Sequence, residues 1–292
     1  MPRVYATLIA VAALWGAATG LLIPRAAYRL SVEPDRRWRD TCPAGHTLAG
    51  PAGGWLGTPA CRTCTTEAAS PAPPASPAPP GTAPTSGPAT APGTTTPGST
   101  LDATPEPTPA PLRRPITAPL LTGLTCATLA LANGPRPELV VWLLSAPFAL
   151  LLATVDVRVH RLPDQLTLPL AAATPLLLAV AELLPYDGGS WLHALFGALA
   201  LGGGYFALFL IHPTGMGFGD VKLALSLGAA LGWYGWGVLF AGTFAGFLLG
   251  ALYGLGLVLA RRGSRTSAIP FGPFMLGGAL LGLVLGALSA TP

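Results

Sequence analysis

The sequence predicts an all-α fold: a polytopic membrane helix bundle with about eight transmembrane helices and a cytoplasmic, partly disordered loop. Of its 292 residues, 51% are hydrophobic and only 10% are charged, against about 25% charged in soluble domains. Apolar runs of about 20 residues, the length that spans a bilayer, recur along the chain. The net charge of +4 arises from basic residues between these runs. Such residues indicate membrane topology, and we expect no nucleic-acid partner.

The first apolar run extends from about Val4 to Ile23 and is followed by Arg25 and Arg29. A cleaved signal peptide is the alternative interpretation, but the run is long and only Arg3 precedes it. We therefore expect residues 1–29 to form a retained first transmembrane helix.

The segment from residue 30 to residue 115 is not membrane-like. Its first part, residues 30–66, holds three cysteines and a histidine. Its second part, residues 67–115, is rich in proline, with 14 prolines and no aromatic residue between Pro71 and Pro111. Because such a composition cannot bury a core, we expect a disordered, partly polyproline II linker here.

Apolar runs resume after the linker and predict a seven-helix domain over residues 116–292. One run, at 221–260, is too long for a single span and is expected to divide near Gly232 to Gly235. The other runs lie at 116–133, 138–155, 166–184, 191–211 and 271–290.

The distribution of basic residues supports eight crossings. With the N-terminus outside, only Arg3 and Arg136 of the 16 Lys and Arg residues lie outside, and the other 14 lie inside. A single span at 221–260 would instead place Arg261, Arg262 and Arg265 outside, against the positive-inside rule. The sequence thus predicts a multi-pass protein of the cell membrane.

Six acidic residues follow the linker, and this topology divides them between the two faces of the membrane. Asp156, Asp164 and Asp220 fall on the cytoplasmic side, and Glu138, Glu182 and Asp187 on the other. Acidic residues at membrane depth are costly and usually functional. Two close carboxyl groups cannot both ionise easily, so one can serve as a base while the other stays an acid. That division suits peptide hydrolysis, because the base activates water and the acid protonates the leaving amine.

The loop before Asp220 reads GMGFG at residues 215–219. Glycines permit close backbone approaches, so this loop could bring Asp220 against a partner helix and a substrate backbone. The alternative is that Asp220 only caps a helix N-terminus, where an aspartate is favourable. The spacing alone leaves both readings open.

Three blocks follow one another in the chain: DVRVHRLPDQLTLP at 156–169, GFGDVK at 217–222 and IPFGPF at 269–274. In this order they resemble the prepilin leader peptidases, a family of GxGD-type aspartic peptidases. The resemblance implies that Asp156 and Asp220 are the catalytic pair. It makes the remaining motif residues candidates for substrate binding or for shaping the loop: Pro163, Asp164, Gly217, Gly219 and Lys222.

The resemblance also implies an activity. Enzymes of this family cut the short basic leader from type IV prepilin and pseudopilin precursors on the cytoplasmic side, and proteolysis of this kind needs no cofactor. Many of them then methylate the new N-terminus with S-adenosylmethionine. The cytoplasmic placement of Asp156 and Asp220 expected from the charges agrees with this geometry.

Cysteine spacing in the first cytoplasmic segment indicates a metal site. Cys61 and Cys64 form a CxxC pair, and Cys42 with His46 could complete a tetrahedral zinc site. Free thiols are the alternative, and Cys126, in an apolar run, is expected to be a packing residue. The family resemblance implies two CxxC pairs, and here the first is degenerate. The segment associated with methylation is also reduced, so S-adenosylmethionine is expected only if methyltransferase activity is retained.

Two other classes of function compete with the peptidase. In an ion-coupled transporter or channel component, Asp156 and Asp220 would line a proton or cation path. That reading predicts acids near the middle of the bilayer and often repeated halves, and neither is seen in the sequence. A catalytically silent scaffold, whose proline tract binds partners, is the third reading.

Overall fold

A computed structural model of the chain describes residues 2–33, 36–57, 61, 63, 64, 116–185, 188–213, 215–260 and 270–290. Its helices are α1 (Pro2–Gly20), α2 (Ile23–Leu30), α3 (Pro51–Gly54), α5 (Thr117–Asn133), α6 (Glu138–Val159), α7 (Asp164–Glu182), α8 (Trp191–Ile211), α9 (Phe218–Gly232), α10 (Trp236–Leu259) and α11 (Gly272–Ser289). Within these described ranges the one β-type pairing is an isolated bridge between Thr41 and Thr47. The predicted all-α fold is confirmed.

Each of the eight predicted apolar runs is a helix. Six described helical segments are long and apolar enough to cross a membrane: 3–30, 138–159, 164–182, 191–211, 236–259 and 272–289. The helices α5 and α9 are shorter, with 17 and 15 residues. Both nevertheless pack among the longer helices, so the structure is a multi-pass membrane bundle.

Glycine and proline set the helix boundaries in the second half of the chain. Gly235 lies between α9 and α10 with φ of +101°, a conformation that glycine adopts without strain. The predicted division of the run at 221–260 is thereby confirmed. Pro163 precedes the first residue of α7 in an extended conformation, which suits a residue just outside a helix N-terminus.

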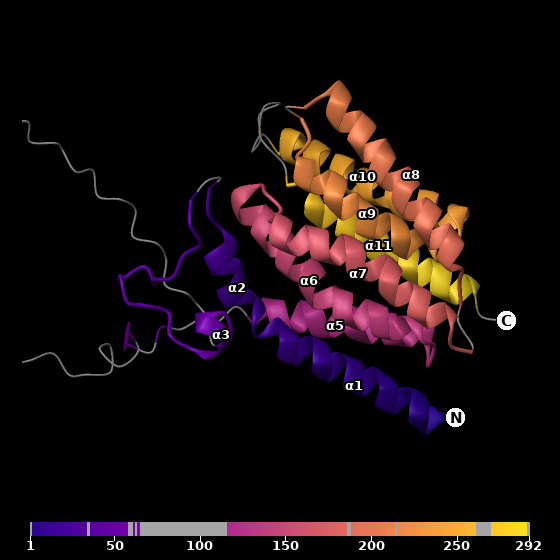
Figure 1. Cartoon of the computed structure of the whole chain (residues 1–292), viewed down its shortest axis with the longest axis horizontal. Coiled ribbons are helices and arrows are strands. Elements are labelled where there is room, and N and C mark those ends of the chain that lie inside the picture. Colours follow the sequence, from indigo (N-terminus) through magenta and orange to yellow (C-terminus); the bar gives the residue numbers. More distant parts are fainter. Residues whose placement is uncertain are drawn as a thin grey trace, which may run out of the picture.

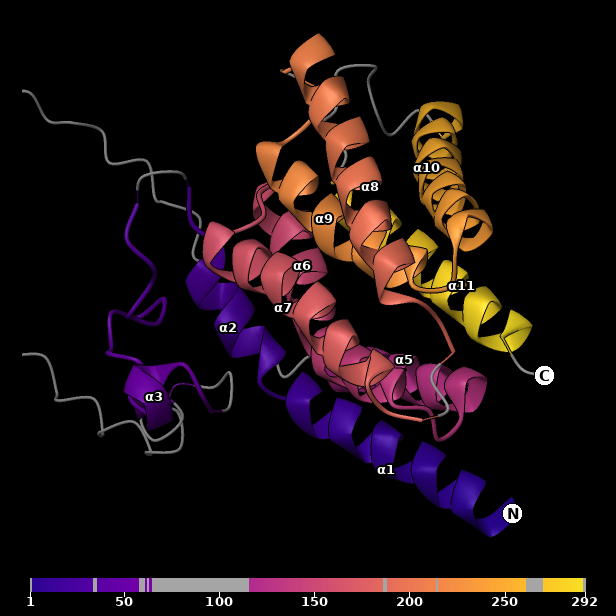
Figure 2. The same ribbon diagram turned by 45° about the vertical axis from the view of Figure 1, so that its right-hand side comes forward.

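Helix α9 lies at the centre of the bundle, packed against α7, α8 and α11 (Figures 1 and 2). Its contact with α8 is close because Gly197 and Gly228 face each other, and a Cβ on Gly228 would lie 2.4 Å from the Gly197 carbonyl oxygen. Helix α1 packs on α5 at one edge of the bundle, and α10 packs on α11 at the other (Figure 2). Close contacts between small residues, as between Gly197 and Gly228, are typical of membrane helices.

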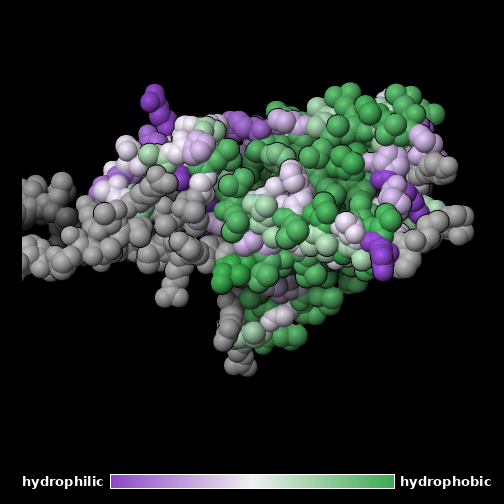
Figure 3. Space-filling model, turned by 90° about the horizontal axis from the view of Figure 1, so that it is seen from below, coloured by the Kyte–Doolittle hydropathy of each residue, from purple (hydrophilic) through white to green (hydrophobic). Residues whose placement is uncertain are grey.

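A broad apolar surface covers the helices, and hydrophilic side chains gather toward the ends of the bundle (Figure 3). Helix α2, α3 and the turn between α6 and α7 lie at one end, whereas α1 begins and α11 ends at the opposite end (Figure 1). The predicted linker at 67–115 and the loop that contains Arg261, Arg262 and Arg265 lie outside the described residues.

Candidate active site

Asp156 lies in the last turn of α6, and its side chain is buried, with the residue 4% exposed. The backbone N–H of Gly272, the first residue of α11, donates a hydrogen bond of 2.9 Å to Asp156 Oδ2. A Cβ on Gly272 would lie 2.8 Å from the same oxygen. A side chain at position 272 would therefore require the Asp156 carboxyl group or the start of α11 to move.

Asp220 lies in the first turn of α9 and is 8% exposed. Its backbone N–H donates to the Gly217 carbonyl oxygen at 3.0 Å, which fixes the turn at the helix start. Tyr205 of α8 is buried and close enough to the Asp220 carboxyl group to interact with it electrostatically. Asp220 is placed where a helix N-terminus favours an anion, and it also faces a second carboxylate.

Asp156 and Asp220 line one cavity of about 270 Å³, although they are 64 positions apart in the sequence. Their carboxyl groups are close enough to repel each other when both are ionised. The other lining residues come from the α6–α7 turn, from the start of α7 and from the loop and first turn of α9: His160, Arg161, Leu162, Asp164, Gly217, Phe218, Gly219 and Lys222. This arrangement can divide the roles of acid and base between two carboxyl groups.

The predicted motif residues gather around this cavity. Lys222 Nζ forms an ion pair of 2.7 Å with Asp164 Oδ1 and lies over the Phe218 ring, 4.8 Å from its centroid. Gly219 packs on Leu162, where a Cβ would lie 2.8 Å from the leucine Cβ. Gly217 also lines the cavity.

Pro163 is the exception among the motif residues. It precedes the start of α7 and lines a smaller cavity of about 130 Å³, together with Arg36, Trp38 and Arg161. Its place therefore indicates a role in setting the α6–α7 turn.

Three further residues at this site were not singled out from the sequence. His160 ends α6 with a positive φ of 50°, and its backbone N–H donates to the Asp156 carbonyl oxygen at 2.8 Å. Gly272 and Tyr205 contribute a backbone donor and a buried neighbour. Gly272 and His160 carried a signal, since they lie inside the blocks at 269–274 and 156–169, whereas Tyr205 lies outside all three blocks.

A second, apolar cavity of about 350 Å³ runs along the bundle between α5, α6, α7, α9 and α11. Its α6 residues include Ser145, Ala149 and Ala153, which lead along one face of that helix toward Asp156. Its α11 residues begin at Pro273, next to Gly272. The apolar cavity thus ends close to the carboxylates.

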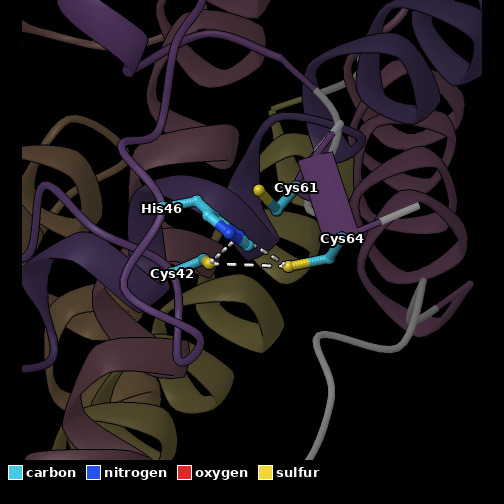
Figure 4. A group of neighbouring side chains, drawn as sticks. All are labelled: Cys42, His46, Cys61 and Cys64. Atoms are coloured by element: carbon cyan, nitrogen blue, oxygen red, sulfur yellow. Dashed lines mark hydrogen bonds between the residues drawn. The ribbon is translucent and has the colours of Figure 1, made fainter. Parts of the chain in front are cut away.

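The four predicted metal ligands come together in the segment that follows α2 (Figure 4). Cys42 Sγ is 3.7 Å from Cys64 Sγ and 3.8 Å from His46 Nδ1, and His46 Nδ1 is 3.3 Å from Cys64 Sγ. The ligand atoms, including that of Cys61, all lie within 4.8 Å of one another. Sulfur and nitrogen ligands on a tetrahedral zinc ion are separated by roughly 3.5 to 3.8 Å. The separations among Cys42, His46 and Cys64 are close to these values, and Cys61 offers a fourth ligand atom within 4.8 Å of the others, so the donor set suits zinc.

The two thiols of the CxxC pair differ in acidity. A hydrogen bond from the Cys64 backbone lowers the pKa of Cys61 to about 6. Burial and the neighbouring Cys42 thiol raise the pKa of Cys64 to about 11. Cys61 is therefore available as a thiolate near neutral pH. A bound cation would favour deprotonation of the other two thiols as well.

The segment that follows His46 holds α2 in place. Arg25 Nη2 donates to the Ala49 carbonyl oxygen and Arg29 Nη1 to that of Gly53, both at 2.8 Å. The Arg29 guanidinium also lies 4.3 Å from the centroid of the Trp55 ring. Because α2 packs against α6 near Val155, the Cys/His segment is linked to the helix that carries Asp156.

The fold and the site together define a multi-pass membrane protein with two carboxylates in one cavity at an end of its helix bundle. The chain belongs to the type IV leader peptidase family, whose model matches residues 143–255, a range that contains both Asp156 and Asp220.

Individual relatives agree with this assignment. The prepilin leader peptidase/N-methyltransferase of Aeromonas salmonicida (strain A449) is 36% identical over 157 residues, 53% of each chain. The enzyme of the same name from Bacillus subtilis (strain 168) is 30% identical over 170 residues, 57% of this chain and 64% of the relative. The leader peptidase HopD of Salmonella typhimurium is 34% identical over 150 residues, 48% of this chain and 88% of the relative.

The chain spans about half the length of the Aeromonas relative. No solved structure matches it significantly.

Proposed function

We propose that this chain is a membrane aspartic endopeptidase that cleaves the leader peptide of type IV prepilin or pseudopilin precursors at the cytoplasmic membrane face. The observation that carries the proposal is the single cavity shared by Asp156 and Asp220. The substrate class comes from the names of the relatives, which include prepilin leader peptidase and leader peptidase.

The proposed chemistry follows from two carboxyl groups that share one proton. The ionised group takes a proton from a water molecule as the water attacks the scissile carbonyl, and the protonated group donates to the departing amine. Burial of both groups excludes bulk water and strengthens their interaction. The Gly272 N–H orients the Asp156 carboxyl group for this step.

The cytoplasmic placement rests on where the positive charges lie. Arg158 and Arg161 flank the turn that follows Asp156, and α2, with Arg25 and Arg29, lies at the same end of the bundle (Figure 1). Basic residues accumulate on the cytoplasmic side of membrane proteins.

Proteolysis by this pair needs no cofactor. We also propose that Cys42, His46, Cys61 and Cys64 bind a structural zinc ion, supported by the distances between their ligand atoms. Such an ion would hold the segment that contacts Arg25 and Arg29. S-adenosylmethionine enters only if the chain shares the N-methyltransferase part of its relatives' names, and no described residue set supports a site for it.

The transporter reading has less support than the peptidase. Asp156 and Asp220 lie in terminal turns of their helices, in a polar cavity at one end of the bundle. A proton or cation path would be expected to place such acids near the middle of the bilayer. The scaffold reading gives no reason for two carboxylates to share a buried cavity.

A cleavage assay with a pilin-like precursor tests the proposal. Purified full-length protein should release the leader, as seen by mass spectrometry of both products, and Asp220→Asn should not. Glu182→Gln is the matched control, since Glu182 is exposed at the far end of α7. Equal cleavage by wild type and Asp220→Asn, or none by wild type with several precursors, would refute the proposal.

A further inference from the structure

A group of polar side chains lies at the end of the bundle opposite to Asp156 and Asp220. We call it the polar clasp, and it consists of Asn133, Glu138, Trp142 and Tyr234. Glu138 is the first residue of α6 and is fully buried. It is 18 residues from Asp156, or about 27 Å along a helix. Tyr234 directly follows the end of α9, the helix that begins near Asp220.

The Tyr234 hydroxyl is the centre of the polar clasp. It lies 2.5 Å from Asn133 Oδ1 and 3.5 Å from Glu138 Oε1, the two acceptors to which it can donate. Trp142 Nε1 donates to the same hydroxyl oxygen at 3.2 Å. The Asn133 amide is itself oriented, because its Nδ2 donates to the Leu129 carbonyl oxygen at 2.8 Å.

The polar clasp also reaches α11 and the loop before α8. Arg136 Nη1 is 3.9 Å from Glu138 Oε1 and donates to the Ala287 carbonyl oxygen at 3.1 Å. A Cβ on Gly188 would lie 2.6 Å from Glu138 Oε1, so the loop approaches the carboxylate closely. The non-cytoplasmic ends of α5, α6, α9 and α11 are thereby joined through one set of polar contacts.

This connection matters because α6 and α9, the two helices that carry the aspartates, have almost no direct backbone contact. Each packs instead on α7 and α11. The contact between Trp142 of α6 and Tyr234, whose rings lie 6.2 Å apart, therefore joins the two helices without an intermediary.

Buried polar groups are costly when unpaired and strongly favour the arrangement that satisfies them. A shift of α9 along its axis by one residue, about 1.5 Å, would break the contacts of the Tyr234 hydroxyl. The polar clasp thus favours one axial position of α9 relative to α6.

We propose that Tyr234 is a positioning residue for the pair Asp156 and Asp220, because the polar clasp fixes the height of α9 against α6 and so the separation of the two carboxyl groups. The catalytic consequence rests on the proposed peptidase function, whereas the structural consequence does not.

The structural part is tested by hydrogen exchange on the full-length protein. Tyr234→Phe removes the hydroxyl and keeps the ring, and Trp142→Phe, a second variant, removes the donor to it. Each should accelerate amide exchange in peptides covering 155–166 and 216–224, at the far end of the bundle, as well as near the substitution. Tyr253→Phe is the control, since Tyr253 is a half-exposed tyrosine of α10 that packs on Phe274. Faster exchange confined to residues 130–145 and 229–238 would overturn the proposal.

The catalytic part is tested by kinetics with a pilin-like precursor. Misplacement of reacting groups by about 1 Å lowers kcat by about 10- to 100-fold, and we expect a loss of this size for Tyr234→Phe. Its KM should stay unchanged, because no residue of the polar clasp lines the cavity that holds Asp156 and Asp220. The interval between the two limbs of the pH–rate profile should also change, since it reports the interaction of the carboxyl groups. A fall in active fraction with an unchanged profile would refute positioning. If wild type cleaves nothing, the proposed function fails while the exchange result still decides the structural part.

Discussion

Lys222 and Asp164 form an ion pair of 2.7 Å that joins the second turn of α9 to the first residue of α7 at the cavity of Asp156 and Asp220. The lysine is mostly buried, whereas the aspartate side chain is 52% exposed. Because one partner is solvated, the pair contributes about 1 kcal/mol or less to stability. Its more specific effect is to hold the start of α7 against the loop that carries Asp220.

Asp164→Asn should therefore retain measurable cleavage, with a several-fold loss at most, because it weakens the ion pair and leaves the proposed catalytic pair, Asp156 and Asp220, intact. Lys222→Met should have an effect of similar size. The exchanged variant, Asp164→Lys with Lys222→Asp, should recover part of the loss if the pairing matters. Initial rates on a pilin-like precursor measure all three. A dead Asp164→Asn enzyme would instead place Asp164 in the catalytic pair.

The hydrogen bond from the Gly272 N–H to Asp156 predicts that adding one methyl group at position 272 lowers the cleavage rate. Gly272→Ala would place a Cβ 2.8 Å from Asp156 Oδ2, so the carboxyl group must move or the helix must shift. We expect kcat to fall by about 10- to 100-fold. Gly277→Ala, on the same helix, is the control, since its Cβ would lie 3.4 Å from Leu249 Cδ1, an ordinary contact. Equal rates for both variants would show that the Gly272 contact is unimportant.

Much of this architecture was predictable from the sequence, because a bilayer requires long apolar helices and basic residues mark their cytoplasmic ends. The same logic placed Asp156, Asp164 and Asp220 on one side, and the structure brings them to one cavity. The structural contribution of Gly272 was not predictable, because its contact uses a backbone N–H that no residue pattern reveals.

Other features needed the three-dimensional arrangement. Glu138 was assigned only to the face opposite Asp156 and Asp220, since its partner Tyr234 is 96 residues away. Arg25 and Arg29 were interpreted as topology signals, yet both are buried and hold backbone carbonyls of the Cys/His segment. Long-range pairings of this kind have no local periodicity from which they could be predicted.

The metal proposal predicts one zinc ion per chain by elemental analysis of protein purified without chelator. Cys61→Ser and His46→Ala should each lower the zinc content, because three ligands hold the ion less tightly than four. Chelation should expose Cys42, Cys61 and Cys64 to alkylation. Cys126→Ala serves as the control, since Cys126 is buried in α5, apart from the cluster. Absence of zinc, with all three thiols freely alkylated, would refute the proposed zinc site.

The topology proposal is tested by cysteine-accessibility labelling. Position 85, in the predicted linker, and position 264, in the loop after α10, should be labelled only from the cytoplasmic side, because 14 of the 16 basic residues then lie inside. Thr85→Cys and Ser264→Cys provide the reactive groups. Labelling of the two positions from opposite sides would refute the arrangement with eight crossings.

The central prediction is that Asp156 and Asp220 act as one unit. Asp156→Asn and Asp220→Asn each keep the size and polarity of the side chain, remove its acid–base function and add no charge to a helix, so membrane insertion should be preserved. With one carboxyl group gone, the other ionises as an isolated group and cannot supply the shared proton. Each single variant should therefore lose about 100- to 10,000-fold in kcat, and the double variant should be little worse, because effects within such a unit are strongly non-additive. Cleavage of a pilin-like precursor, with the amount of folded protein measured in parallel, gives the comparison. Near wild-type rates for either single variant, or losses that multiply in the double variant, would show that the two carboxylates do not share one catalytic step.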